Sequence, residues 1–256
     1  MNKRIIPCLD IRDGRVVKGK KFKDIQDVAE PLSLAKRYEE EQADELFILD
    51  ITGKDREQFL RIIKELAVNL SIPISVGGGI RTIDDIKAVL DAGAGKVSIT
   101  SAAIANPSLL SEAATLFQSK QIVLSIDAKK VAPHQWHAFT SGGKTDSGLD
   151  VVEWAKQGEQ LGVGEILLNS IDTDGIKDGY DLNLNKAVAN AVNIPIIASG
   201  GAGKMEDFKD VLTDGKANAA LAASVFHYET INIFELKKFL HKFDIPLKEM
   251  ANKNDK

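Results

Sequence analysis

Short apolar runs alternate with amphipathic stretches along the whole chain. Apolar runs with no polar face are typical of parallel strands buried on both sides, whereas apolar residues three or four apart indicate helices. The pattern predicts strands at 4–10, 46–51, 73–77, 96–100, 121–127, 165–170, 195–199 and 218–222. It predicts helices between them, most clearly at 36–42, 84–92, 150–161, 206–212 and after an Asn106 cap followed by Pro107. Eight such units fit a (β/α)8 barrel.

An internal repeat divides this pattern in two. IIPCLD at 5–10 aligns with IVLSID at 122–127, and GGIRTIDDIKAVL at 78–90 aligns with GGAGKMEDFKDVL at 200–212. The offset changes only from 117 to 122 residues, and no linker-like composition appears near residue 120. We therefore predict one barrel domain over residues 1–256, built from homologous half-barrels at about 1–120 and 121–256, each too small to close alone.

Composition narrows the classes of protein that remain. The net charge is −4, which gives no support to nucleic-acid binding, and the single cysteine excludes an internal disulfide. The basic start is followed by only a short apolar run that Asp10 ends, which is neither a signal peptide nor a membrane span. We expect a cytoplasmic protein without membrane contact.

Asp10 and Asp127 occupy equivalent positions in the two halves, at the ends of the first and fifth strands. These strands lie opposite each other in a barrel, and the carboxyl ends of barrel strands carry the chemistry of barrel enzymes. A single aspartate there could equally be a turn or cap residue. The symmetric pair favours a general acid and a general base that face each other across the mouth.

Glycine runs follow the third and seventh strands, at 77–79 and 200–201. Glycine lets backbone N–H groups approach a phosphate closely, and the loop after the seventh strand is the usual phosphate site of a barrel. One pair would be weak evidence, because turns use glycine anyway. Its duplication predicts two phosphate sites on opposite sides of the mouth, and hence a ligand with a phosphate at each end.

The connections at 11–30 and 128–148 are longer than usual, so they are candidate lids on the same face. The first is rich in lysine, and most of this charge is expected to face solvent. His134 and His137 lie in the second, but without an acidic or cysteine partner at metal-ligand spacing we predict no metal site.

Several motifs together resemble the cyclase subunit of imidazole glycerol phosphate synthase, over nearly the entire chain. They are IIPCLDI-x-DGRVVKG, VGGGIRT, GLDVVEWA, GEILLNSIDTDG, IPIIASGGAGK and ALAASVFH. The resemblance implies an enzyme of histidine biosynthesis that takes ammonia from a partner glutaminase. It implies conversion of a bisphosphorylated ribulosyl-formimino aminoimidazole carboxamide nucleotide into imidazole glycerol phosphate and aminoimidazole carboxamide ribotide, without a cofactor.

The resemblance also implies roles for individual residues. Asp10 and Asp127 become the acid–base pair, and Lys18 matches a loop lysine near the substrate. One phosphate is expected at Gly79, Thr100 and Ser101. The other is expected at Asp174, Gly175, Gly201, Ala223 and Ser224.

Charged residues stand at the starts of four strands, and these are Arg4, Glu45, Lys96 and Glu165. They predict a ring of alternating sign on the barrel floor, a position that usually serves stability. The resemblance implies in addition an ammonia gate beneath which the glutaminase docks, at the N-terminal face, to form a heterodimer.

Four positions depart from the family pattern. Thr100 stands for a common Asn, Asn169 for a common Thr, Ser141 for a common His, and Gly95 for an acidic residue that usually precedes the lysine. They leave open the phosphate contacts, the orientation of the substrate and the coupling to the glutaminase.

Three other functions remain open at this point. The sister isomerase of histidine biosynthesis shares the half-barrel repeat but needs no ammonia partner. A cyclase-like subunit could serve another ammonia-dependent pathway, and a non-catalytic barrel could only dock and regulate a glutaminase. The paired aspartates, the Lys18 loop and the charged floor favour the active cyclase over these alternatives.

Overall fold

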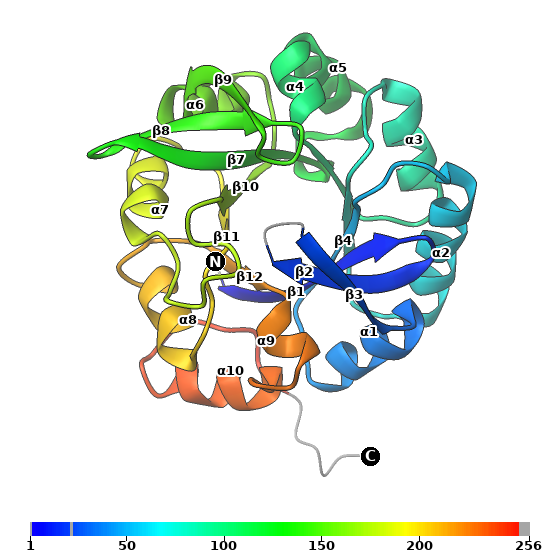
Figure 1. The fold of residues 1–256 in the computed structure, drawn as a ribbon, viewed down its shortest axis with the longest axis vertical. Coiled ribbons are helices and arrows are strands. Elements are labelled where there is room, and N and C mark those ends of the chain that lie inside the picture. Colours follow the sequence, from blue (N-terminus) through cyan, green and yellow to red (C-terminus); the bar gives the residue numbers. More distant parts are fainter. Residues whose placement is uncertain (1, 21–22, 251–256) are drawn as a thin grey trace.

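The computed structural model describes residues 2–20 and 23–250, and at 18–20 and 23–28 it describes the backbone only. Eight parallel strands form one closed sheet with a ring of helices outside it (Figure 1). The sheet closes because β7 pairs with β10 as well as with β6. The barrel strands are β1 (Arg4–Arg12), β4 (Leu46–Asp50), β5 (Ile74–Gly77), β6 (Lys96–Ile99), β7 (Ile122–Ala132), β10 (Glu165–Ser170), β11 (Ile196–Ser199) and β12 (Ala219–Ala222). The predicted (β/α)8 barrel and all eight of its strands are confirmed.

Helices follow the strands in turn. They are α1 (Pro31–Glu40), α2 (Arg56–Asn69), α3 (Ile83–Asp91), α4 (Ser101–Ala105), α5 (Ser108–Phe117), α6 (Val151–Gln160), α7 (Leu182–Ala189), α8 (Met205–Leu212), α9 (Ser224–His227) and α10 (Ile233–His241), with a 3-10 turn at Ser119–Gln121. The stretch predicted at 36–42 is only the second half of α1, which begins at Pro31 behind a Glu30 cap. Asn106 does not cap α5 through its side chain, because its Oδ1 accepts instead from the Ser108 hydroxyl at 2.7 Å.

The two long connections, predicted as candidate lids, contain antiparallel ribbons. β1 continues into a ribbon with β2 (Arg15–Lys20) and β3 (Lys23–Ala29), and β7 into one with β8 (Gln135–Thr140) and β9 (Thr145–Asp150). The second ribbon is held by apolar side chains of β8, since Trp136 and Ala138 are buried. Figure 1 shows the two ribbons on opposite sides of the same barrel mouth.

The alternation of side chains along each strand separates two cores. Ile5, Leu9 and Ile11 belong to the large cluster that the helices cover. Ile6 and Cys8 belong to a second cluster, built from strand residues, which also contains Phe47, Val123, Leu167, Ile197, Ala219 and Leu221. Because successive residues of a strand face opposite ways, Arg4 and Asp10 share the inner face of β1 with Ile6 and Cys8. The barrel interior therefore runs from a charged floor through an apolar layer to the aspartate at the mouth.

The two halves also share a helix cap. Asp85 at the start of α3 accepts from the backbone N–H groups of Arg81 (2.9 Å) and Thr82 (3.0 Å). Asp207 at the start of α8 accepts from Gly203 (2.8 Å) and Lys204 (2.9 Å). Each carboxylate therefore fixes the loop that leads from a glycine pair into the next helix, and it does so on both sides of the barrel.

Replacing Asp85 with asparagine is expected to remove a pH-dependent part of the stability. Burial acts to raise the pKa of Asp85, but the hydrogen bonds from Arg81 and Thr82 outweigh it and hold the pKa below its ordinary value. A lowered folded-state pKa contributes stability above the unfolded-state pKa of about 4, and this is lost as the pH falls through the folded-state pKa. We expect Asp85→Asn to cost about 0.5–1 kcal/mol at pH 7, since the carboxylate is a partly exposed helix cap. The difference in urea midpoint between variant and wild type should shrink as the pH falls below about 4, and a difference that does not shrink on acidification would contradict this reading.

Candidate active site at the mouth of the barrel

Asp10 and Asp127 stand on opposite walls of the barrel. Four strand steps separate β1 from β7 in either direction around the closed sheet. Asp10 is 9% exposed, and the Cys8 sulfur lies 3.9 Å from its Oδ1. Each aspartate lies on the inner face of its strand, in line with Cys8 on β1 and Val123 on β7. Both side chains therefore belong to the barrel interior.

Asp127 has a distinct electrostatic environment. Its Oδ1 accepts a hydrogen bond from Nδ2 of Asn169 at 3.0 Å. Burial raises the pKa of Asp127, the bond from Asn169 acts to lower it, and the negative charge of Asp174 raises it further, so that the pKa stays above its ordinary value. A carboxyl group with a raised pKa can both give and take a proton nearer to neutral pH, which suits general acid–base catalysis.

The first predicted phosphate site, called the first glycine cradle from here on, lies after β5 and β6 and comprises Gly78, Gly79, Thr100 and Ser101. Gly78 and Gly79 have φ of +88° and +67°, a region open chiefly to glycine. A Cβ on Gly78 would overlap the carbonyl oxygen of Asp50, so no other residue fits there. Gly79, by contrast, faces open space, because the nearest atom to a Cβ there would be the Gly53 Cα at 3.7 Å. The exposed backbone of Gly79 can therefore be approached by a ligand from this side.

Thr100 and Ser101 complete the first cradle after β6. Thr100 has φ −115° and ψ −95°, and the equivalent Ala223 has φ −122° and ψ −73°. The halves therefore repeat an uncommon backbone conformation as well as a sequence. The Ser101 hydroxyl accepts from the backbone N–H of Ser141 at 3.1 Å, which places the β8–β9 turn beside this cradle.

The second predicted phosphate site, the second glycine cradle, follows β11. The loop after β10 packs against it. Gly201 has φ +113°, and the Gly179 carbonyl occupies the space that a Cβ would need. The Gly179 N–H donates to the Gly201 carbonyl at 2.9 Å. Asp174 and Gly175 lie on that same loop, and Ala223 and Ser224 follow the neighbouring strand β12. The structure thus brings the residues of each predicted cradle onto adjacent strand ends.

Lys18 lies on β2, where its Cα is paired with Gln26 of β3. Its side chain falls outside the part of the chain that the structure describes. The expectation that it lies near a substrate therefore stays a prediction.

Four charged side chains meet on the barrel floor. Arg4 donates to both Glu45 and Glu165. The Nζ of Lys96 lies 3.0 Å from Glu45 and 2.7 Å from Glu165. Burial opposes the charge of Arg4, but the two carboxylates outweigh it and raise its pKa. Gly95 is exposed beside this floor, immediately before Lys96.

Two serines, one beside the floor ring and one beside Asn169, were not predicted from the sequence. Ser75 donates its hydroxyl to Glu45 and so joins the floor ring. Ser199 donates to Asn169, which itself was noted only as a departure from a family pattern. The alternation along β5 and β11 places both serines on the inner face, but nothing in the sequence shows which side chains they meet.

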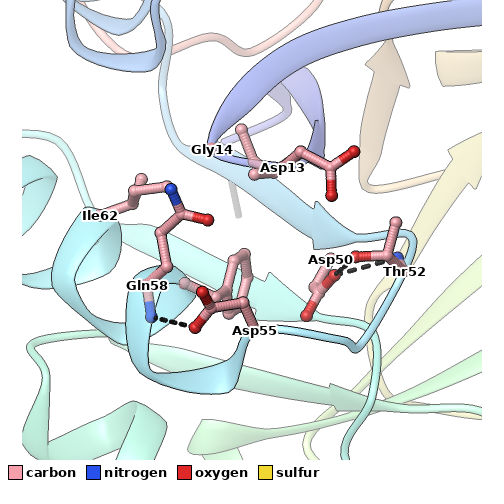
Figure 2. Close-up of a pocket in the computed structure, with 9 residues that line it drawn as sticks. Asp13, Gly14, Asp50, Thr52, Asp55, Gln58 and Ile62 are labelled. Atoms are coloured by element: carbon pink, nitrogen blue, oxygen red, sulfur yellow. Dashed lines mark hydrogen bonds between the residues drawn. The ribbon is translucent and has the colours of Figure 1, made fainter.

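A small cavity beside the mouth is lined by three more aspartates, Asp13, Asp50 and Asp55 (Figure 2). Two of them accept hydrogen bonds from nearby backbone N–H groups. Oδ1 of Asp50 accepts from the N–H groups of Thr52 (3.0 Å) and Gly53 (2.8 Å). Asp55 caps α2 by accepting from the N–H of Gln58 at 2.9 Å. These carboxylates shape loops, and within residues 2–20 and 23–250 no group of three His, Cys, Asp or Glu is placed to hold a metal ion. Nor is any helix in these ranges long and apolar enough to cross a membrane.

Comparisons with known proteins agree with this geometry. Residues 4–232 match the family described as histidine biosynthesis protein. The imidazole glycerol phosphate synthase subunit HisF of Oceanobacillus iheyensis is 55% identical, over 96% of this chain and 97% of its own length. The same subunit is 48% identical in Alkaliphilus metalliredigens (97% and 99% covered) and 52% in a Hydrogenobaculum species (95% and 97%). The chain therefore belongs to the histidine biosynthesis family, and within it to the HisF subunits of imidazole glycerol phosphate synthase.

Proposed function

We propose that the chain uses ammonia to convert the bisphosphorylated ribulosyl-formimino aminoimidazole carboxamide nucleotide into imidazole glycerol phosphate and aminoimidazole carboxamide ribotide. The observation that carries this proposal is the placement of Asp10 and Asp127 on opposite walls, between two duplicated glycine cradles. A ligand with a phosphate at each end would span the mouth and pass over both carboxyl groups. The backbone N–H groups near Gly79 and Gly201 would hold its ends.

The two aspartates supply what this chemistry needs. An amine that forms a new C–N bond must lose a proton, and an oxygen or nitrogen that leaves carbon must gain one. Addition of ammonia, ring closure and release of the ribotide therefore require several proton transfers on both sides of the reacting atoms. Two carboxyl groups in different environments can alternate as donor and acceptor, and the raised pKa of buried Asp127 makes it suited to carry a proton.

The floor supports delivery of ammonia from a glutaminase subunit docked at the N-terminal face of the barrel. The two cations and two carboxylates of the ring pair with one another, so no charge is left there to compensate a desolvated ammonium ion, whereas neutral ammonia needs no such compensation. Above the floor lies the apolar layer that includes Ile6, Phe47 and Leu167, which also favours the neutral molecule. The ring thus stabilises the floor and selects the form of nitrogen that can react.

The sister isomerase is the alternative that shares most of this geometry, because it too needs two phosphate sites. The charged floor ring and the close similarity to HisF subunits favour the cyclase. A transfer to another ammonia-dependent pathway would leave the duplicated cradles without a doubly phosphorylated ligand. A purely regulatory barrel would have no use for a buried Asp127 with a raised pKa.

The protein alone, with an ammonium salt and no glutaminase, is expected to form imidazole glycerol phosphate from the bisphosphorylated substrate. The rate should follow the concentration of neutral ammonia, so at fixed total ammonium it should rise about tenfold per pH unit well below pH 9 until an enzyme group limits it. Product can be quantified by chromatography. Isomerisation of a phosphoribosylformimino substrate without any use of ammonia would establish the sister activity instead.

A further inference from the structure

Asn169 lies between Asp127 and Ser199 in one row across three neighbouring strands. Its Cα is in register with Asp127 of β7 on one side and with Ser199 of β11 on the other. Nδ2 of Asn169 donates to Oδ1 of Asp127 at 3.0 Å, and the Ser199 hydroxyl donates to Oδ1 of Asn169 at 3.1 Å. The three side chains form a hydrogen-bonded chain that rests on strands rather than on loops.

Ser199 fixes which way the amide of Asn169 faces. Because the amide oxygen accepts from the hydroxyl, the amide nitrogen must face the carboxylate. Gly200 leaves room for this arrangement, since a Cβ there would stand 3.2 Å from the Asn169 oxygen and 2.7 Å from the Ser170 carbonyl. The donor to Asp127 is therefore oriented before any ligand arrives.

The first half of the barrel repeats the aspartate without this support. Asp10 is in register with Leu49, and Leu49 with Gly77. Leu49 has no donor, and Gly77 has no side chain to orient one; a Cβ there would stand 2.8 Å from the Leu49 side chain. The half-barrel repeat has thus kept both carboxyl groups, but only Asp127 has an amide donor on the neighbouring strand.

We propose that Asn169, held by Ser199, is a positioning residue that anchors Oδ1 of Asp127 and leaves Oδ2 to exchange the proton with substrate. The inference rests on the proposed function, in which Asp127 transfers protons. Within the described residues no hydrogen bond reaches Oδ2. When Asp127 is protonated, the proton sits on Oδ2, because Oδ1 already accepts the N–H of Asn169. Asn169 therefore selects the reactive oxygen without touching the reacting atoms.

Asn169→Leu copies the first half of the barrel and tests this role. The charged group that acts on Asp127 is Asp174, and the variant leaves it in place, as it does Asp10 on the opposite wall. Loss of the N–H donor removes the bond that lowers the pKa of Asp127, so its carboxyl titration in ¹³C NMR should move to higher pH without substrate. With ammonium as donor, kcat should fall roughly tenfold or more while KM changes little. The limb of the pH profile that Asp127 governs should move to higher pH whether it acts as acid or as base.

Two further variants separate positioning from a structural effect. Ser199→Ala leaves the amide free to turn, so it should shift the Asp127 titration in the same direction but less. Ser170→Ala changes the next residue of β10, on the opposite face, and should leave titration and activity as in wild type. An Asp127 titration that is unchanged in Asn169→Leu and in Ser199→Ala overturns the positioning role, whatever the activity. If both variants shift the Asp127 titration as expected but the wild-type protein never turns over substrate, the proposed function is wrong and the positioning role stands.

Discussion

Asp127→Asn should abolish the ammonium-dependent reaction, and Asp10→Asn should do the same, each by about 10²–10⁴-fold in kcat. Asparagine keeps the shape of the side chain but can neither take a proton nor give one at neutral pH. Asp127 matters in particular because burial and the charge of Asp174 raise its pKa, a property that a merely structural carboxylate on this face has no need for. The fold should persist, because asparagine matches aspartate in size and shape and neither aspartate lies at a helix start among the described residues.

Single-turnover assays with ammonium would measure this loss, with circular dichroism to verify the fold. Asp13→Asn is a matched control, since Asp13 is an exposed aspartate in the turn after β1, three residues beyond Asp10. It should retain wild-type activity. An Asp127→Asn protein with more than about a tenth of wild-type kcat would remove Asp127 from the chemistry.

The eight barrel strands were predictable because their residues are apolar on both faces. Strands such as Ile166–Leu168 are enclosed by helices outside and by other strands inside, so their character survives in the sequence as an unbroken apolar run. The duplicated glycine runs indicated which strands are equivalent, because corresponding strands of two homologous half-barrels occupy corresponding positions in the barrel. For these elements local sequence and global fold agree.

The ribbons failed prediction for the opposite reason. β9 is exposed along almost all of its length, and TDSGLD carries no apolar alternation. Its strand character comes from pairing with β8, which itself depends on Trp136 and Ala138 packing against the barrel. A strand that is defined by its neighbour rather than by its own burial leaves no local signal.

The anchoring of Asp127 was out of reach for a related reason. Asn169 and Asp127 are 42 residues apart, and Ser199 is 30 residues from Asn169. Only the register of three strands brings them into one row, and a shift of one residue would turn each side chain to the other face. The repeat predicted two equivalent aspartates, whereas their difference lies in Leu49 and Asn169, which no alignment of the halves marks as functional.

Lys96→Met should weaken the floor of the barrel and uncouple it from a glutaminase, while ammonium-dependent catalysis survives. Lys96 bonds both Glu45 and Glu165, whose side chains are 1% and 5% exposed. Without it, two buried carboxylates share the single guanidinium of Arg4, and a buried carboxylate that loses a partner is costly. We expect a loss of about 2–4 kcal/mol in unfolding free energy, since Arg4 still compensates part of the charge.

The same variant separates the structural from the gating role of the ring. If the ring selects neutral ammonia that arrives from below, Lys96→Met assayed with glutamine and a glutaminase subunit should lose most of its activity, whereas with external ammonium it should stay within about twofold of wild type. Lys87→Met serves as control, because the exposed Lys87 pairs on the helix surface with Asp91 four residues on and should change neither urea midpoint nor activity. Equal losses with both nitrogen sources would mean that the ring only holds the floor together. An unchanged urea midpoint would contradict even that role, because it would mean that Glu45 and Glu165 tolerate burial without Lys96.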